Sequence, residues 1–234
     1  KANHILAVTY NNIGDTYQHM GKYAIAQDYY KKSLEMHIEL YGENHPDVAT
    51  IKNNIGACYF DMGNNNLALE YYQKSLQITE KLLGNKHPDV AILYNNIGLV
   101  YSSQNDYNRA LECYENALLI NRLVYGDKHP SIAGAYNNLG AIYEDKKNYA
   151  QALEYHKKSL EISKLCYEKN HPAIARSYNN IASVYLSLDN YTSALKYNKK
   201  ALKMRIEIFG EVHSSIAQSY NNLGAVYNAI GKYP

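Results

Sequence analysis

Apolar and small side chains recur at steps of three and four residues along the chain, which is the spacing of one face of an α-helix. One such stripe contains Ala49, Ile55 and Tyr59, and another begins at Ala68. Glycine and asparagine residues at 63–66 separate the two stripes, and both residue types favour helix ends. The segment therefore predicts two helices joined by a short turn.

This pattern returns at a fixed interval of 42 residues without insertions. Asn-Asn pairs mark the interval at 11–12, 53–54, 95–96, 137–138, 179–180 and 221–222. Such an interval indicates a solenoid, in which each repeat stacks on its neighbours. It predicts a single array of five helix pairs and one more first helix, at about 5–46, 47–88, 89–130, 131–172, 173–214 and 215–230. Because the sixth pair is incomplete and the chain does not begin with methionine, we expect a fragment of a longer protein.

A small residue stands in the middle of every predicted first helix. These residues are Gly14, Gly56, Gly98, Gly140, Ala182 and Gly224. Small side chains let two helices approach closely. We therefore expect a larger residue at Gly98 to overpack the contact between the two helices of its pair.

The repeat resembles the tetratricopeptide repeat, whose signature combines Leu-Gly-x-x-Tyr in the first helix with Ala-x-x-x-aromatic in the second. Here Ile13-Gly14 precedes Tyr17, and Ala26 precedes Tyr30. The usual repeat has about 34 residues, and the longer interval of this chain is similar to that of kinesin light chains. The resemblance implies an all-α, right-handed superhelical solenoid of antiparallel helix pairs. It also implies a concave groove, lined by the first helices, in which family members bind peptides.

The Asn pairs lie on the face of each first helix opposite the apolar stripe, which is the groove face by this resemblance. Asparagine is a mediocre helix former, but its amide donates and accepts hydrogen bonds as a peptide backbone does. We hypothesise that a peptide is held by Asn12, Asn54, Asn96, Asn138, Asn180 and Asn222, together with Asn53, Asn95 and Asn137. The alternative is a structural ladder, in which each amide bonds to the neighbouring helix and fixes the stacking.

Selectivity is expected from groove positions that differ between repeats. Ile92, Leu99 and Arg176 are the candidates for side-chain pockets, and Arg176 is the clear base among them. The acids on this face are Asp15, Asp61, Glu144 and Asp145. A neutral to mildly acidic face predicts a protein or peptide partner that is neutral or basic.

Composition argues against several other classes of function. Lys and Arg number 24 against 22 Asp and Glu, which gives no support for a nucleic-acid partner or an anionic membrane surface. No apolar run approaches the roughly 18 residues of a membrane span. Three widely spaced cysteines predict a reducing, cytoplasmic location. Because no catalytic, phosphate-binding, dinucleotide or zinc motif is visible, we expect no enzyme activity, no cofactor and no metal.

Histidine recurs just before each first helix, at His45, His87, His129, His171 and His213. Zinc ligands must lie within about 2.1 Å of one ion, whereas stacked helix pairs separate these histidines by about 20 Å. We therefore assign them a structural role at the helix start.

Two other functions stay open. One is a sensor or regulatory arm of a larger enzyme, such as a protease or an NTPase. The other is end-to-end assembly, because the last helix is expected to expose Tyr220, Leu223 and Tyr227 without a partner helix.

Overall fold

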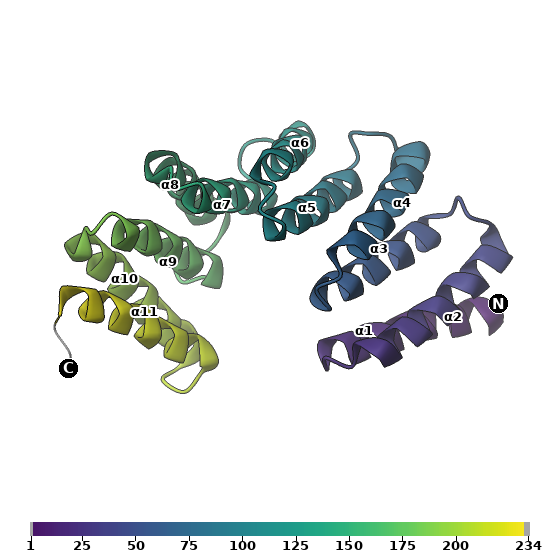
Figure 1. The fold of residues 1–234 in the computed structure, drawn as a ribbon, viewed down its shortest axis with the longest axis horizontal. Coiled ribbons are helices and arrows are strands. Elements are labelled where there is room, and N and C mark those ends of the chain that lie inside the picture. The colour runs from purple at the N-terminus through teal and green to yellow at the C-terminus, as the bar shows by residue number, and fades with distance from the viewer. Residues whose placement is uncertain (1, 232–234) are drawn as a thin grey trace. The chain divides into compact units, whose positions relative to one another are not determined.

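The computed structural model describes residues 2–231, and within that range it contains eleven α-helices and no strand. The helices are α1 (Ala2–His19), α2 (Tyr23–Tyr41), α3 (Pro46–Asp61), α4 (Asn65–Leu83), α5 (Pro88–Ser103), α6 (Tyr107–Tyr125), α7 (Pro130–Asp145), α8 (Tyr149–Cys166), α9 (Pro172–Ser187), α10 (Tyr191–Phe209) and α11 (Ser214–Ile230). Consecutive helices pack as antiparallel pairs, with α1 against α2 and α3 against α4 (Figure 1). The predicted all-α solenoid of helix pairs is confirmed.

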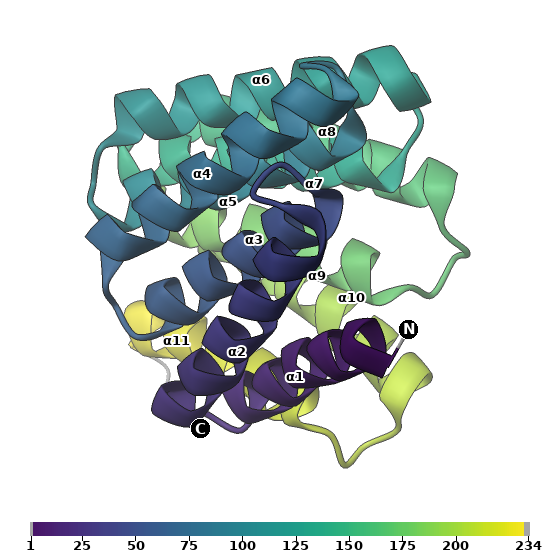
Figure 2. The same ribbon diagram turned by 90° about the vertical axis from the view of Figure 1, so that its right-hand side faces the viewer.

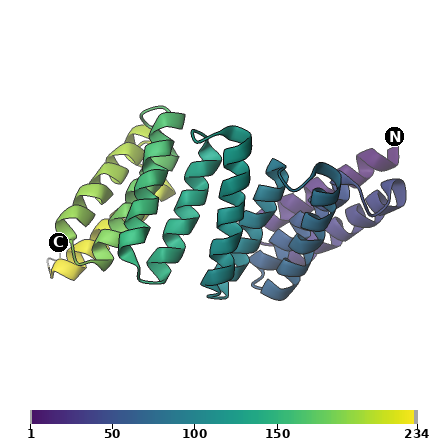
Figure 3. The same cartoon turned by 90° about the horizontal axis from the view of Figure 1, so that it is seen from above.

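The chain forms two compact units. Unit 1 comprises Lys1–Val124, and unit 2 comprises Tyr125–Pro234. In unit 1, α3 packs between α2 and α4 and also touches the first helices α1 and α5 (Figure 2). In unit 2, α9 packs between α8 and α10 and also touches α7, and neighbouring helices run in opposite directions (Figure 3). The first helices α3 and α9 therefore contact neighbouring repeats as well as the second helix of their own pair.

A close contact at the mid-helix glycine holds the helix pairs together. A Cβ atom at Gly98 would lie 2.7 Å from the ring of the buried Tyr114. In the one pair where alanine replaces this glycine, at Ala182, the shorter Asn198 occupies the place of the tyrosine. The size of the residue on one helix is thus matched to the size of the residue on the other.

The abundance of tyrosine follows from a contact between first and second helices that recurs along the chain. Tyr59 on α3 stacks on Tyr71 on α4 with ring centroids 5.6 Å apart, and the Lys74 ammonium lies 5.4 Å from the centre of the Tyr71 ring. Equivalent stacks join Tyr17 to Tyr29, Tyr143 to Tyr155 and Tyr185 to Tyr197. Stacking and cation–π attraction add to the gain from burying these rings.

The recurring histidine caps the first helix that follows it. The ring Nδ1 of His171 accepts a hydrogen bond from the backbone N–H of Ala173 at 3.2 Å. The same ring stacks on Tyr167, with centroids 3.7 Å apart. Equivalent caps form at His45, His87, His129 and His213. These bonds satisfy a backbone N–H that has no partner within the helix, and they confirm the predicted structural role of the histidines.

Replacing His171 with alanine should lower the free energy of unfolding by about 0.5–2 kcal/mol, the usual cost of losing a helix cap. His171→Asn keeps a side-chain acceptor and should recover most of this loss. Urea denaturation followed by circular dichroism measures both. Equal losses in the two variants would assign the effect to the Tyr167 stack instead of the cap.

Two local expectations were wrong. Asn65 and Asn66 belong to α4 and not to the turn before it. The reason is that the Asn64 side chain starts that helix, by accepting a hydrogen bond from the Leu67 N–H at 3.3 Å. On the last helix, Tyr220 is exposed as expected, but Leu223 is buried and Tyr227 is half-buried, and α10 is the helix that packs on α11.

The cysteines are free thiols. Burial raises the pKa of Cys58 and of Cys113 to about 11 in each case. Both thiols are therefore protonated at neutral pH and serve as small apolar groups in the core.

Candidate functional site

The Asn pairs lie on the first helices and link neighbouring repeats. The second Asn of a pair donates through Nδ2 to Oδ1 of the first Asn one repeat earlier. The bonds seen within the two units are Asn54 to Asn11 at 3.1 Å, Asn96 to Asn53 at 2.8 Å and Asn180 to Asn137 at 3.3 Å. These bonds join one first helix to the next, which is the bracing role that the sequence left open beside ligand binding.

An Asn side chain that bonds to the neighbouring helix can still bind a ligand. A side-chain amide has two N–H donors and an oxygen with two lone pairs, so Asn96 keeps hydrogen-bonding capacity after donating to Asn53. Asn96 is half-buried, and Asn12 is exposed. The residues predicted to give selectivity also lie at the surface. Ile92 is 53% exposed, Leu99 is 43% exposed, and Arg176 is exposed.

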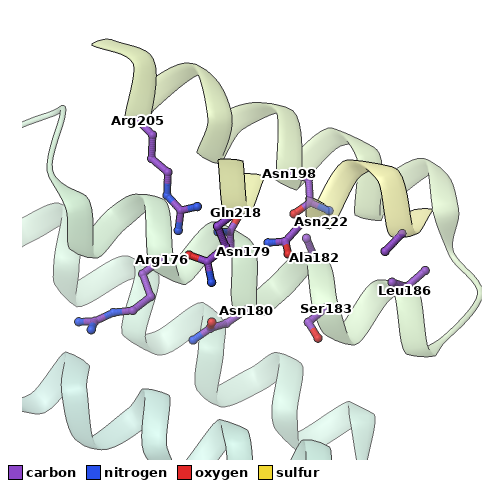
Figure 4. A pocket seen from close by; sticks show the side chains of 11 residues that line it. Arg176, Asn179, Asn180, Ala182, Ser183, Leu186, Asn198, Arg205, Gln218 and Asn222 are labelled. Atoms are coloured by element: carbon purple, nitrogen blue, oxygen red, sulfur yellow. The ribbon is translucent and has the colours of Figure 1, made fainter. Parts of the chain in front are cut away.

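Unit 2 contains a cavity of about 380 Å³ between α9, α10 and α11 (Figure 4). Arg176, Asn179 and Asn180 line it from α9, and Gln218 and Asn222 line it from α11. The cavity therefore opens among the predicted asparagines and contains one of the three residues predicted to give selectivity.

Arg205 enters this cavity from α10 and extends toward Asn179 and Gln218 (Figure 4). Its side chain is only 8% exposed. Nη1 donates to the Ser215 carbonyl oxygen at 3.0 Å and to Ser219 Oγ at 2.8 Å. With the Asn179 amide oriented so that its oxygen faces the guanidinium, Asn179 accepts two further bonds at 2.7 and 3.0 Å.

No carboxylate pairs with Arg205 among residues 2–231. Burial lowers the pKa of the guanidinium, because a charge removed from water is disfavoured. Arginine nevertheless stays protonated in proteins. The cavity thus holds a buried positive charge that is surrounded by neutral oxygens.

Unit 1 contains the corresponding pocket, with different chemistry. It has a volume of about 210 Å³ between α3, α4 and α5. Thr79 stands in the place of Arg205, Thr50 in the place of Arg176, and Ile92 in the place of Gln218. The repeat therefore builds one kind of pocket, between two consecutive first helices, and changes the side chains that line it.

We use the term floor position for the buried residue of each second helix that is equivalent to Arg205. The floor positions are His37, Thr79, Asn121, Ser163 and Arg205, and all five are buried. These positions were not predicted from the sequence, because the groove was expected only on first helices. The signal that marks them is a polar residue that changes type from repeat to repeat within an otherwise regular helix pattern.

The repeat pattern also matches a known family. Residues 5–81, 47–118, 106–164, 131–207 and 173–234 match the family model for the tetratricopeptide repeat. The chain belongs to the tetratricopeptide repeat family. The resemblance drawn from the sequence is therefore confirmed.

Solved structures of other tetratricopeptide-repeat proteins share the fold. BtubC (BKLC) from P. vanneervenii is 23% identical, with 90% of this chain and 84% of that chain covered and a TM-score of 0.77. A putative kinesin light chain from Podosopora anserina with nearly identical TPR-like repeats is 17% identical, with coverages of 89% and 98% and a TM-score of 0.74. A signal transduction ATPase with numerous domains (STAND) from Pyrococcus horikoshii, which has a tetratricopeptide repeat sensor, is 18% identical, with coverages of 99% and 34% and a TM-score of 0.74. At these identities the likeness establishes the fold alone.

Comparison with curated proteins gives no match. In the part of the chain that the structure describes, none of the helices combines the length and the apolar character needed to cross a membrane.

Proposed function

We propose that the array is a protein-interaction module, not an enzyme, which binds an extended peptide along the face that carries the Asn pairs. Tetratricopeptide repeats generally mediate contacts between proteins. The observation that supports this site is the buried Arg205 guanidinium, which faces a cavity among the asparagines of α9 and α11 and has no carboxylate partner in residues 2–231. A peptide that places a carboxylate in the cavity supplies the missing charge.

A carboxylate is the expected ligand group because burying the Arg205 charge is energetically costly. An unpaired ion removed from water loses several kcal/mol, which the neutral oxygens of Ser219 and Asn179 offset in part. A carboxylate forms shorter, charge-assisted bonds with a guanidinium and can accept two of them in parallel. Arg176 adds a second positive charge to the lining of the cavity. The unit 2 pocket should therefore select an acidic side chain or a C-terminal carboxylate.

The unit 1 face favours other residues of the peptide. Its pocket is lined by Ile92 and Thr79 and contains no cation, while Asp15 and Asp61 lie exposed on α1 and α3. Burial of an apolar side chain is favourable in this pocket, and the Asp89 carboxylate that lines it disfavours an acidic one. We propose that neutral or basic residues bind along unit 1, as the sequence led us to expect for the whole groove, and that the asparagine amides bind the peptide backbone. The carboxylate proposed for the unit 2 pocket departs from that expectation.

A peptide selection tests this proposal. A display library of short peptides is selected on the full chain, and enriched peptides are titrated by fluorescence anisotropy. Enriched peptides should share an acidic residue or need a free C-terminal carboxylate, and a photo-crosslinker beside that group should label α9, α10 or α11. Absence of enrichment over an unrelated helical protein, or labelling of other helices only, would refute the proposal.

The bracing role of the asparagines makes a separate prediction. Asn96→Ala removes the bond to Asn53 and should lower the free energy of unfolding by about 0.5–1.5 kcal/mol, the net worth of a typical hydrogen bond. Asn12→Ala is the matched control, because Asn12 is exposed on the first helix of the array. Its effect should stay within about 0.5 kcal/mol. Chemical denaturation that finds equal losses would contradict the bracing role.

Two alternatives keep some support. The chain matches 34% of the length of the Pyrococcus horikoshii protein, whose repeats are described as a sensor, so a regulatory arm of a larger enzyme is the runner-up. End-to-end association through α11 has the exposed ring of Tyr220 in its favour. Sedimentation of the wild type and Tyr220→Ser tests the latter, because an association that persists unchanged in the variant excludes this contact.

A further inference from the structure

Three potential metal ligands converge at the first helix pair of unit 1, away from the cavity of Arg205. They are His4 on α1, His37 on α2 and Asp47 in the first turn of α3. One ligand atom from each lies within 4.8 Å of the others. His37 is only 2% exposed, and its Nε2 lies 3.8 Å from Oδ2 of Asp47.

The hydrogen bonds around His37 set which ring nitrogen can act as a ligand. Nδ1 lies 2.8 Å from the Ser33 carbonyl oxygen, which can only accept, so Nδ1 carries a proton. In the neutral ring the lone pair is then on Nε2, which faces the Asp47 carboxylate. Histidines that bind metals usually donate their other N–H to a carbonyl or carboxylate in this way.

A cation between these groups would account for two further observations. The 3.8 Å separation of Nε2 and Oδ2 is too long for a hydrogen bond. Nδ1 of His4 is buried and has no hydrogen-bond partner. Buried polar atoms are normally paired, so an unpaired ring nitrogen beside a second ring nitrogen and a carboxylate requires an explanation.

We propose that His4, His37 and Asp47 bind one divalent transition-metal ion, with zinc as the best fit. Imidazole nitrogens and a carboxylate oxygen are ligands that zinc uses, at about 2.0–2.2 Å. Tetrahedral bonds of that length place ligand atoms about 3.4 Å apart, so small side-chain movements bring the three groups into position. The ion joins three helices and leaves one coordination position for water or for a group from a ligand.

The site is specific to the first repeat. Pro46, Thr79 and Asp89 stand one repeat later in the places of the three ligands, so only the aspartate is retained there. Because the chain itself uses these residues at equivalent positions, His37→Thr is a substitution that the fold accommodates. Thr79 Oγ1 donates to the Ser75 carbonyl oxygen at 2.9 Å, which reproduces the bond of His37 to Ser33.

Calorimetric titration of zinc chloride into the full chain, free of affinity tags and stripped with a chelator, tests the proposal. We expect one ion per chain, a zinc-dependent rise in the melting midpoint, and visible absorption typical of four-coordinate cobalt when Co²⁺ is used instead. His37→Thr and Asp47→Ser should each lower zinc affinity by about tenfold or more. Asp89→Ser, which alters the equivalent aspartate of the next repeat, should leave zinc affinity unchanged.

Melting curves recorded without zinc test whether each variant is folded. If His37→Thr does not fold, Asp47→Ser alone tests the loss of zinc affinity. The absence of zinc binding to the wild type would overturn the proposal. So would zinc affinity that is equal in the wild type, His37→Thr and Asp47→Ser, because the ion would then bind elsewhere.

Discussion

Replacing Gly98 with leucine should lower the free energy of unfolding by about 1–3 kcal/mol, the usual cost of overpacking a core. The first added carbon would lie 2.7 Å from the ring of Tyr114, which is buried and packed on all sides. α5 cannot move away from Tyr114 without opening its contacts with α4. Denaturant titration of the wild type and the variant measures the loss.

Gly224→Leu is the matched control, because it makes the same change at the same place in the repeat. A Cβ atom at Gly224 meets nothing within 4 Å. Leucine is a better helix former than glycine by up to about 1 kcal/mol, so this variant should be as stable as the wild type or more stable. Equal destabilisation by both substitutions would show that the backbone, and not the contact with Tyr114, requires glycine.

Arg205→Met should weaken binding of a selected acidic peptide by about 2–5 kcal/mol, the range for removing one partner of a buried charge pair. Its effect on the free energy of unfolding should be small or favourable, because replacing a buried charge with an apolar side chain of similar length is often neutral or stabilising. This separation of affinity from stability identifies a ligand-binding residue. Substitution of a residue needed only for the fold would lower peptide affinity and stability together.

Lys203→Met is the control for charge. It removes one positive charge from the same helix, but the Lys203 side chain is exposed, 80% accessible, and lies outside the cavity of Arg205. Its effect on peptide affinity should be below about 1 kcal/mol, since exposed charges are screened. A loss as large as that of Arg205→Met would indicate general attraction between the chain and the peptide instead of a specific site.

Local rules were sufficient to predict the helix pairs from the sequence. Pro46 and Gly84, and their equivalents in other repeats, mark helix ends through backbone preferences that do not depend on tertiary structure. The small residue in each first helix likewise predicts a close approach, although its partner Tyr114 becomes evident only from the packing. The Asn64 cap was missed because asparagine favours both the end of one helix and the start of the next.

The candidate site was less predictable, because it depends on which residues meet across repeats. Helical spacing placed the Asn pairs and Arg176 on the face opposite the apolar stripe, but it does not reveal that Asn96 bonds to Asn53 on another helix. Arg205 belongs to a second helix, and its burial arises only when α11 covers it. His4 and His37 are likewise far apart in the sequence, so their convergence with Asp47 is a property of the stacked helices.

We propose above that the Arg205 cavity recognises a carboxylate of a peptide ligand. The most direct measurement is anisotropy titration of a selected acidic peptide and its matched amide, with Glu replaced by Gln or the C-terminus amidated, against the wild type and Arg205→Met. We expect the wild type to prefer the acid by about tenfold or more and Arg205→Met to bind acid and amide equally. A wild type that binds both equally, or a preference that persists in Arg205→Met, would contradict it.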